Sequence, residues 1–515
     1  MISLKSFRID KSKSNSMDCM REKKIFIDSF INQKIFNRLI IKLSNYIKID
    51  PAILELKIKK IVSGEFNFEN NCFNNNSSYF QIIKNFIIFY YFLFLITFRS
   101  KKSEPIKTDI ILFNVDYFDD VEKFKKILCN YSHSTIITNK KFNFMNIKKS
   151  IQDTYLRENI KIDYGDGTLN INFKDKNNSY KINATIKCKH DIDIDSSCIE
   201  NKYLLFKFGF SLLHQSLKKK FNFLKYFNVA LFAYVNNYSI FKKYESKKII
   251  QDRIFSTCAI RNYIFKKMGG NVSACVQSHL TEASINFYND TDLFFTFGDE
   301  QFSKLSLEEL GSRIESAHPV GSLRAESYYT ESNLNFHSNK NIDILVVGVN
   351  LISWLHVNEQ QKKNYYNHIK LIKKISLKYP NLNICIKHHP GNGSDPIELN
   401  ILKGSNVKFL KAESNSYTYI KNSKVILSCS STMVLEAYGI NGKAYYINPN
   451  YDNHVFFEKN KFLKQITLSE FNQIEETINK IYSDKQAIEI NSDNICLKND
   501  VVSDRIYRKL SSYDL

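Results

Sequence analysis

Several short motifs that would identify a common enzyme class are missing from these 515 residues. No GxGxxG or GxxxxGK[ST] stretch follows a predicted strand, so the sequence predicts neither a dinucleotide-binding fingerprint nor a P-loop. The pattern DIDID at 191–195 lies in a polar stretch and predicts a solvated loop, not a metal-binding DxD motif. We therefore expect no metal site.

Paired cysteines are also missing. The ten cysteines stand singly between Cys19 and Cys496, without a CxxC pattern or metal-ligand spacing. Scattered single cysteines are typical of a reducing compartment. The first residues, MISLKSFRIDKSKSNSMDC, lack the apolar core of a secretory signal, so we expect a cytoplasmic protein.

Acidic residues are few in relation to basic ones: 52 Asp and Glu stand against 73 Lys and Arg, which gives a formal net charge of +21. This balance favours anionic partners such as nucleic acid, an acidic membrane surface or a phosphorylated substrate. The lysines are scattered, with only short runs such as 218–220, and no zinc-finger, RRM or KH signature is present. We therefore expect no nucleic-acid partner and favour an anionic membrane surface.

A long apolar run is missing too. The most apolar stretch, NFIIFYYFLFLITF at 85–98, has 14 residues and is followed by Arg99, Lys101 and Lys102. A transmembrane helix needs about 20 residues, so this run is short for a full span. Two interpretations remain open: an interfacial helix with aromatic and cationic residues at the headgroup level, or a buried core helix.

The chain is too long for one ordinary core, because domains usually have about 100–200 residues. After residue 106, short apolar runs alternate with amphipathic stretches, a pattern that predicts parallel sheets covered by helices. A polar segment at 329–340 separates two such series. The expected organisation is as follows: a helical, partly disordered extension at 1–105, a Rossmann-like domain at 106–328, a second Rossmann-like domain at 340–490 and a tail helix at 491–515. This α/β arrangement resembles the GT-B architecture, in which two Rossmann-like domains face a cleft.

Two local predictions concern the first domain. The alternating runs LNINF and YKINATIKC, separated by KDKNN, predict a β-hairpin. The segment KKIIQDRIFSTCAIRNYIFKKMGG at 247–270 is expected to be one helix, since one stripe contains Ile249, Ile250, Ile254, Ala259, Ile260 and Ile264. Gly269 would end that helix.

A cluster of small hydroxyl residues marks the second domain. In KVILSCSSTMVLEAYGI, a predicted strand leads into Ser428, Ser430, Ser431 and Thr432 and then directly into a helix. Free backbone N–H groups and the dipole at a helix N-terminus attract phosphate. Glu436, one turn further along, is placed to accept hydrogen bonds from ribose hydroxyls. The alternative is structural, because Ser and Thr are common N-cap residues.

A second motif, CIKHHPGNG, precedes the serine cluster. His389 and Pro390 follow a predicted strand, and in a parallel sheet both loops would emerge at the carboxyl edge, where ligands bind. Pro390 restricts the chain and would hold His389 toward a phosphate. A single histidine of this kind is otherwise a structural residue.

Together, the two motifs resemble those of GT-B enzymes with CMP- or CDP-activated donors: sialyl- and polysialyltransferases, Kdo transferases of capsule synthesis and teichoic-acid polymerases. HHP at 388–390 matches their HP motif, and SCSST at 428–432 matches their SS/ST motif. The resemblance implies that His389 contacts the donor phosphate and that Ser430, Ser431 and Thr432 contact the phosphate or cytidine. It also implies a nucleotide-sugar co-substrate with no further cofactor, because helix dipoles and cationic side chains stabilise the leaving nucleotide in such enzymes.

The catalytic base of such an enzyme deprotonates the acceptor hydroxyl. The sialyltransferase-like group has an acidic pair followed by Gly, and in DYGDGTLN only Asp166–Gly167 matches it. The alternative for Asp166 is a tight turn. His279 resembles the histidine of a Gln-His-Gly stretch in capsule enzymes, but it is displaced by one position and the glycine is missing. Asp299 and Glu300 are further candidates.

The resemblance implies transfer of a sugar to a growing surface or capsular polysaccharide or a lipid-linked glycan, at the inner face of the cell membrane. Three other functions remain open: a nucleotide-sugar epimerase of the same fold, a transferase of polyol phosphate from a CDP donor, and a non-catalytic binding protein.

Overall fold

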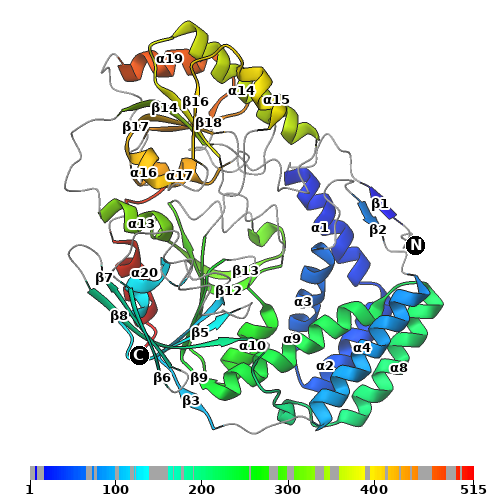
Figure 1. The fold of residues 1–515 in the computed structure, drawn as a ribbon. Helices are drawn as coiled ribbons and strands as arrows, with labels where there is room; N and C mark the ends of the chain where they lie inside the picture. The colour runs from blue at the N-terminus through cyan, green and yellow to red at the C-terminus, as the bar shows by residue number, and fades with distance from the viewer. Residues whose placement is uncertain are drawn as a thin grey trace.

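A computed structural model of the chain shows two α/β domains and a helical layer beside the first of them (Figure 1). The structure describes residues 6–8, 17–64, 72–74, 78–98, 104–115, 121, 123–138, 160–165, 168–174, 179–189, 191–253, 257–277, 288–298, 307–330, 341–347, 359–388, 395–411, 416–428, 431–440, 443–449, 467–482, 495–498 and 501–514.

The first domain is built on a nine-stranded sheet with the order β13-β12-β11-β10-β4-β5-β8-β7-β6. Its strands are β4 (Ile110–Val115), β5 (Ser134–Thr138), β6 (Ile160–Gly165), β7 (Thr168–Lys174), β8 (Ser179–Cys188), β10 (Lys248–Gln251), β11 (Val272–Val276), β12 (Asp290–Thr296) and β13 (Arg313–Pro319). All neighbours are parallel except β7, which is antiparallel to β6 and β8. The central strands are apolar runs buried on both faces, as parallel sheets require. The predicted hairpin is confirmed as β7–β8.

The prediction of one helix over 247–270 is wrong. Ile249 and Ile250 belong to β10, a central strand between β4 and β11, and helix α10 begins only at Ala259 (Ala259–Lys267). A short run of apolar residues has the same burial in a central strand as in a buried helix, so periodicity does not distinguish the two.

Helices from distant parts of the chain share one core beside this sheet. They are α1 (Met17–Ile31), α2 (Lys34–Ile47), α3 (Pro51–Ser63), α4 (Tyr79–Phe98), α8 (Lys202–Lys219), α9 (Phe223–Lys243) and α10. The rings of Phe36 and Phe223 lie 4.9 Å apart and those of Phe30 and Phe221 lie 5.3 Å apart. The segment expected as an extension therefore packs into the core of the first domain. Two small pairs flank it: β1 (Ser6–Arg8) with β2 (Cys72–Asn74), and β3 (Ile106–Lys107) with β9 (Tyr244–Glu245).

The second domain has a six-stranded parallel sheet with the order β16-β15-β14-β17-β18-β19. Its strands are β14 (Ile342–Val347), β15 (Ile384–Lys387), β16 (Lys408–Leu410), β17 (Ser423–Ser428), β18 (Ala444–Ile447) and β19 (Thr467–Leu468). Its helices are α14 (Glu359–Lys378), α15 (Pro396–Leu402), α16 (Ser416–Lys421), α17 (Met433–Tyr438) and α19 (Phe471–Tyr482). Two Rossmann-like α/β domains are thus confirmed.

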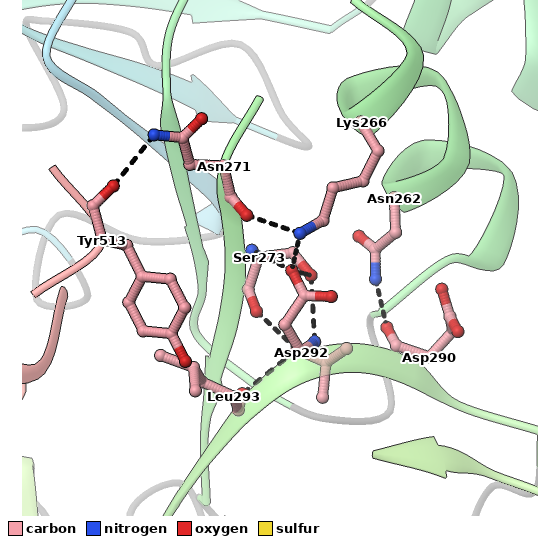
Figure 2. Close-up of polar contacts among 9 residues, drawn as sticks. Asn262, Lys266, Asn271, Ser273, Asp290, Asp292, Leu293 and Tyr513 are labelled. Carbon is pink, nitrogen blue, oxygen red and sulfur yellow. Dashed lines mark hydrogen bonds and ion pairs between the residues drawn. The ribbon is translucent and has the colours of Figure 1, made fainter. Parts of the chain in front are cut away.

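The C-terminal helix α20 (Val502–Ser511) returns to the first domain and packs against α6 (Lys125–Leu128) and α13 (Leu323–Thr330). The Ser503 backbone N–H donates to Glu326 at 3.2 Å, and Arg505 donates to the Val320 carbonyl at 2.8 Å. Figure 2 shows the last contact, in which the Asn271 amide donates to the Tyr513 carbonyl at 2.9 Å. The chain therefore crosses between the domains twice.

Candidate functional site

The point where strand order reverses locates the candidate site in the second domain. The chain enters the sheet at β14, adds β15 and β16 on one side, and then crosses to β17 and β18 on the other. In open α/β sheets, ligands bind beyond the carboxyl ends of the strands at such a switch point. The HHP motif follows β15 and the serine cluster follows β17, so both flank β14.

The serine cluster is tied to β14 by hydrogen bonds. Buried Ser428 donates its hydroxyl to the Val347 carbonyl at 2.9 Å and accepts from the Ser431 N–H at 3.2 Å. The Ser431 hydroxyl accepts from the Met433 N–H at 3.3 Å, while the Thr432 side chain makes no capping hydrogen bond. Ser431 thus supports the start of α17, a helix of only six residues. Ser430 lies outside the described residues.

Glu436 is placed between the two domains. Its carboxylate is buried and accepts from Ser322 at 2.6 Å and from Tyr417 at 2.9 Å. Ser322 follows β13 of the first sheet, and Glu436 lies in the helix after β17 of the second. The contact therefore brings the carboxyl edges of the two sheets together, and a contact between Glu436 and a ribose stays a prediction.

The first histidine of HHP anchors the loop that begins there. His388 Nε2 lies 2.7 Å from Glu398 Oε2, and the Tyr365 hydroxyl donates to Glu398 Oε1 at 2.8 Å. Burial raises the pKa of Glu398 to about 7 and lowers the pKa of His388, so the pair favours its uncharged form. His389 and Pro390 follow directly and lie outside the described residues. Glu398, ten residues further on, carries no motif and was missed by the sequence analysis.

The residues predicted as catalytic lie outside the described residues, but the strands beside them are described. Gly165 of β6 pairs with Thr168 of β7, which leaves the two residues 166–167 as the connection. Since β6 runs in the same direction as β8 and β5, it ends at the carboxyl edge of the sheet. β6 is four strands from β4, about 19 Å at ordinary strand spacing.

His279 follows β11, which also ends at the carboxyl edge and is separated from β4 only by β10. Gln277 holds the end of β11 to β12: its amide oxygen accepts from the Phe297 N–H at 3.0 Å, and its N–H donates to the Phe295 carbonyl at 2.8 Å. The end of β11, from which the chain continues to His279, is therefore held to β12 by two hydrogen bonds. His279 itself, Asp299 and Glu300 lie outside the described residues.

The structure adds a charged group at the switch point of the first sheet, between β4 and β10. Asp252 follows β10, is fully buried, and forms ion pairs with Lys123 and with Arg253 (3.1 Å). Burial raises the pKa of Asp252, but the charges of Lys123 and Arg324 outweigh it and lower the pKa below its usual value. Asp252 is thus held as a carboxylate by the cations around it at this edge. The sequence analysis missed it because Asp252 was expected inside a helix.

Within the described parts of the chain, no group of three or more His, Cys, Asp or Glu side chains could hold a metal ion. The polar cluster of Figure 2, where Lys266 pairs with Asp292 at 2.8 Å, contains residues at the starts of β11 and β12. It therefore lies at the amino edge, away from both switch points.

Two Rossmann-like domains whose carboxyl edges meet, with a C-terminal helix that returns to the first domain, define a protein with the GT-B layout. No family model and no curated protein matches the sequence. Solved structures with similar folds include Acinetobacter baumannii MurG, with 8% identity, a TM-score of 0.35 and coverage of 79% of this chain and 99% of that chain. UDP-GlcNAc 2-epimerase from Neisseria meningitidis has 12% identity and a TM-score of 0.42, with coverage of 79% and 100%. The wall teichoic acid polymerase TagF has 10% identity and a TM-score of 0.37, with coverage of 84% and 96%.

Proposed function

We propose that this protein is a GT-B glycosyltransferase that moves a sugar from a CMP- or CDP-activated donor to a surface or capsular polysaccharide or a lipid-linked glycan. One observation carries the proposal. The HHP loop and the serine cluster, which stand 40 residues apart in the sequence, flank the same strand at the switch point of the second sheet.

In the donor half of the reaction, His389 and the residues Ser430, Ser431 and Thr432 hold the phosphate and cytidine of the donor. The His388–Glu398 pair fixes the residue that directly precedes His389 and Pro390 in the chain. Backbone N–H groups at the start of α17 and the imidazole stabilise the negative charge that develops as the nucleotide leaves.

In the acceptor half of the reaction, a base from the first domain takes the proton of the acceptor hydroxyl. The hydroxyl oxygen bonds at the same time to the anomeric carbon of the donor sugar. Asp166 is the proposed base, and His279 is the second candidate. Lys123 and Arg253 pair with Asp252 at the switch point of the first sheet, on the acceptor side of the proposed site. Closure of the two domains would exclude water, which otherwise hydrolyses the donor.

The substrates define where such an enzyme works. Nucleotide-activated sugars are soluble, whereas a lipid-linked acceptor lies in a bilayer. We therefore place the enzyme in the cytoplasm, on the inner face of the cell membrane, with no further cofactor.

The test is release of CMP or CDP from activated sugars in the presence of glycan acceptors. We expect Asp166→Asn to lower kcat by about 10²–10⁴-fold, the range for loss of a general base. His389→Ala should raise KM for the donor, with melting temperatures unchanged in both variants. Conversion of a UDP-sugar without acceptor would instead indicate an epimerase, and transfer from a CDP-polyol a polyol-phosphate transferase. If no activated sugar is turned over, the protein would instead be a non-catalytic binding protein.

A further inference from the structure

Exposed apolar side chains are concentrated on three neighbouring helices of the first domain. Of the 22 exposed large apolar residues in the described part of the chain, fourteen lie on α4, α8 and α9. Soluble proteins seldom expose contiguous apolar patches of this kind, and such patches mark interaction surfaces. We call these exposed side chains the three-helix surface.

Helix α4 has two different faces. Ile82, Phe89 and Leu93 are buried in the core, whereas Phe80 (76% exposed), Ile87 (62%) and Phe94 (53%) point outward. The outward residues recur at three- and four-residue spacing, which is one continuous stripe of a helix. The core-helix interpretation of the run at 85–98 is thus confirmed for one face, while the membrane-interface interpretation of the other face stays a prediction.

The neighbouring helices α8 and α9 pack against α4 and also expose apolar residues. The ring of Tyr90 lies 4.5 Å from that of Phe206 on α8, and the ring of Phe92 lies 5.0 Å from that of Phe232 on α9. Phe206 and Phe232 are themselves exposed. Exposed apolar residues therefore lie on three helices that contact one another, and Figure 1 shows α4 and α8 side by side at the outer edge of the molecule, away from the second domain.

The charge of these helices has one sign. The sequences of α4, α8 and α9 contain eight lysines and not one aspartate or glutamate. Lys84, Lys207, Lys218, Lys219 and Lys225 are exposed beside the apolar residues. An aromatic-rich face with flanking lysines matches the interface of a bilayer that contains anionic lipids.

We propose that the three-helix surface docks on an anionic lipid bilayer, with α4 lying in the plane of the interface and not crossing the membrane. Helix α4, with 20 residues, is long and apolar enough to span. However, hydrogen bonds hold it to its neighbours: the Tyr90 hydroxyl donates to the Phe206 carbonyl at 2.7 Å and Asn228 donates to the Asn85 carbonyl at 2.8 Å. Crossing the membrane would break these contacts and expose its buried face to lipid. This surface would be the membrane contact of the proposed glycosyltransferase. The docking itself does not depend on the proposed function; only its biological role does.

The test is co-sedimentation of the full chain with phosphatidylcholine vesicles, with and without phosphatidylglycerol. We expect binding to the anionic vesicles, weaker binding to the neutral ones, and a decrease with added salt. The double variant Ile87→Glu/Phe94→Glu should lose at least tenfold in binding. Its matched control is Ile25→Glu/Leu377→Glu, which changes residues of similar exposure (66% and 58%) on other helices and should bind normally.

A second pair of variants tests the contribution of the lysines to vesicle binding. Each lysine near an anionic surface contributes about fivefold to binding, so Lys218→Gln/Lys219→Gln should bind about 25-fold more weakly. The control Lys370→Gln/Lys374→Gln, on α14 of the second domain, should not. Melting curves of all variants show whether they are folded.

Three results would overturn the docking on a bilayer, and a fourth would overturn the in-plane placement of α4. The first is no binding to anionic vesicles, and the second is equal binding by Ile87→Glu/Phe94→Glu. The third is a dimer in vesicle-free solution that this variant dissociates, because the surface would then join two copies of the chain. Resistance of the membrane-bound protein to alkaline carbonate would contradict the in-plane placement of α4. Nucleotide binding, measured without vesicles, reports on the proposed function separately.

Discussion

Among single residues, the two adjacent histidines of HHP have different surroundings. His388 is buried against Glu398, a contact that gives it a structural role, whereas the resemblance assigns donor contact to His389. The sequence analysis singled out the HHP loop, whose role in donor binding stays a prediction. It had no signal for Glu398, because hydrogen-bond partners are set by how α15 packs. The same holds for Lys123 and Asp252, which stand 129 residues apart in the chain.

We expect Glu398→Ala to weaken nucleotide binding although Glu398 is not proposed to touch the ligand. The change removes the acceptor for Tyr365 and the partner of His388, and a buried polar group without a partner costs about 1–3 kcal/mol. Part of that cost would appear as a looser loop and about tenfold weaker binding, measured by calorimetry. Glu470→Ala, on the exposed surface of the same domain, is the control. Equal affinities for both variants would show that the pair does not hold the donor loop.

A pH dependence follows from His368, which is fully buried in α14 and has no hydrogen-bond partner for either ring nitrogen among the described residues. Burial lowers its pKa to about 3. Below pH 6.5 the unfolded chain therefore binds a proton that the folded chain does not, so stability falls as pH decreases from 6.5 toward 3. The slope is at most about 1.4 kcal/mol per pH unit. His368→Leu should reduce the fall in melting temperature between pH 7 and pH 5. The control His214→Leu, at an exposed residue of α8, should show the same fall in melting temperature as the unmodified protein. An equal fall in the unmodified protein and both variants would refute the role of His368.

At the level of helices and strands, the alternation of apolar runs with amphipathic stretches was enough to predict both parallel sheets. The antiparallel hairpin β7–β8 was also predicted, since its residues alternate with period two. The failure at 247–270 has a physical cause: β10 has four residues, all buried, and buried strands and helices have the same composition over so short a run. The role of α8 beside α4 could not be predicted, because the sequence does not state which helices pack together.

A glycine sets the distance between α4 and α8. A Cβ atom at Gly209 would lie 2.6 Å from the Phe89 ring and 2.8 Å from the Tyr90 hydroxyl. Because Phe89 is buried and cannot move away, we expect Gly209→Ala to destabilise the protein by about 1–3 kcal/mol despite its better helix propensity. Gly64→Ala, where the nearest atom is 3.6 Å away, is the matched control for thermal melting. A higher melting temperature for Gly209→Ala would show that the helices are not in close contact.

For the molecule as a whole, the last helix belongs to the first domain although it follows the second in sequence. Ile506 of α20 is fully buried against that domain, and the Lys248–Asp514 ion pair at 2.6 Å adds to the contact. We expect Ile506→Asp to unfold the first domain or to abolish soluble protein, since a buried unpaired charge costs several kcal/mol. Val501→Asp, at the exposed residue that directly precedes α20, should fold normally. Normal melting of Ile506→Asp would mean that α20 is not part of the core.

The central claim is that the second sheet binds a cytidine nucleotide at its switch point, and a thermal-shift comparison of CMP, CDP, UDP, GDP and ADP tests it most directly. A ligand at 100 times its dissociation constant stabilises the folded protein by about 2.7 kcal/mol, which is measurable as a higher melting temperature. The account predicts a shift with CMP or CDP that His389→Ala abolishes and His214→Ala retains. A shift with UDP or GDP alone would overturn the donor assignment, and no shift with any nucleotide would contradict the claim itself.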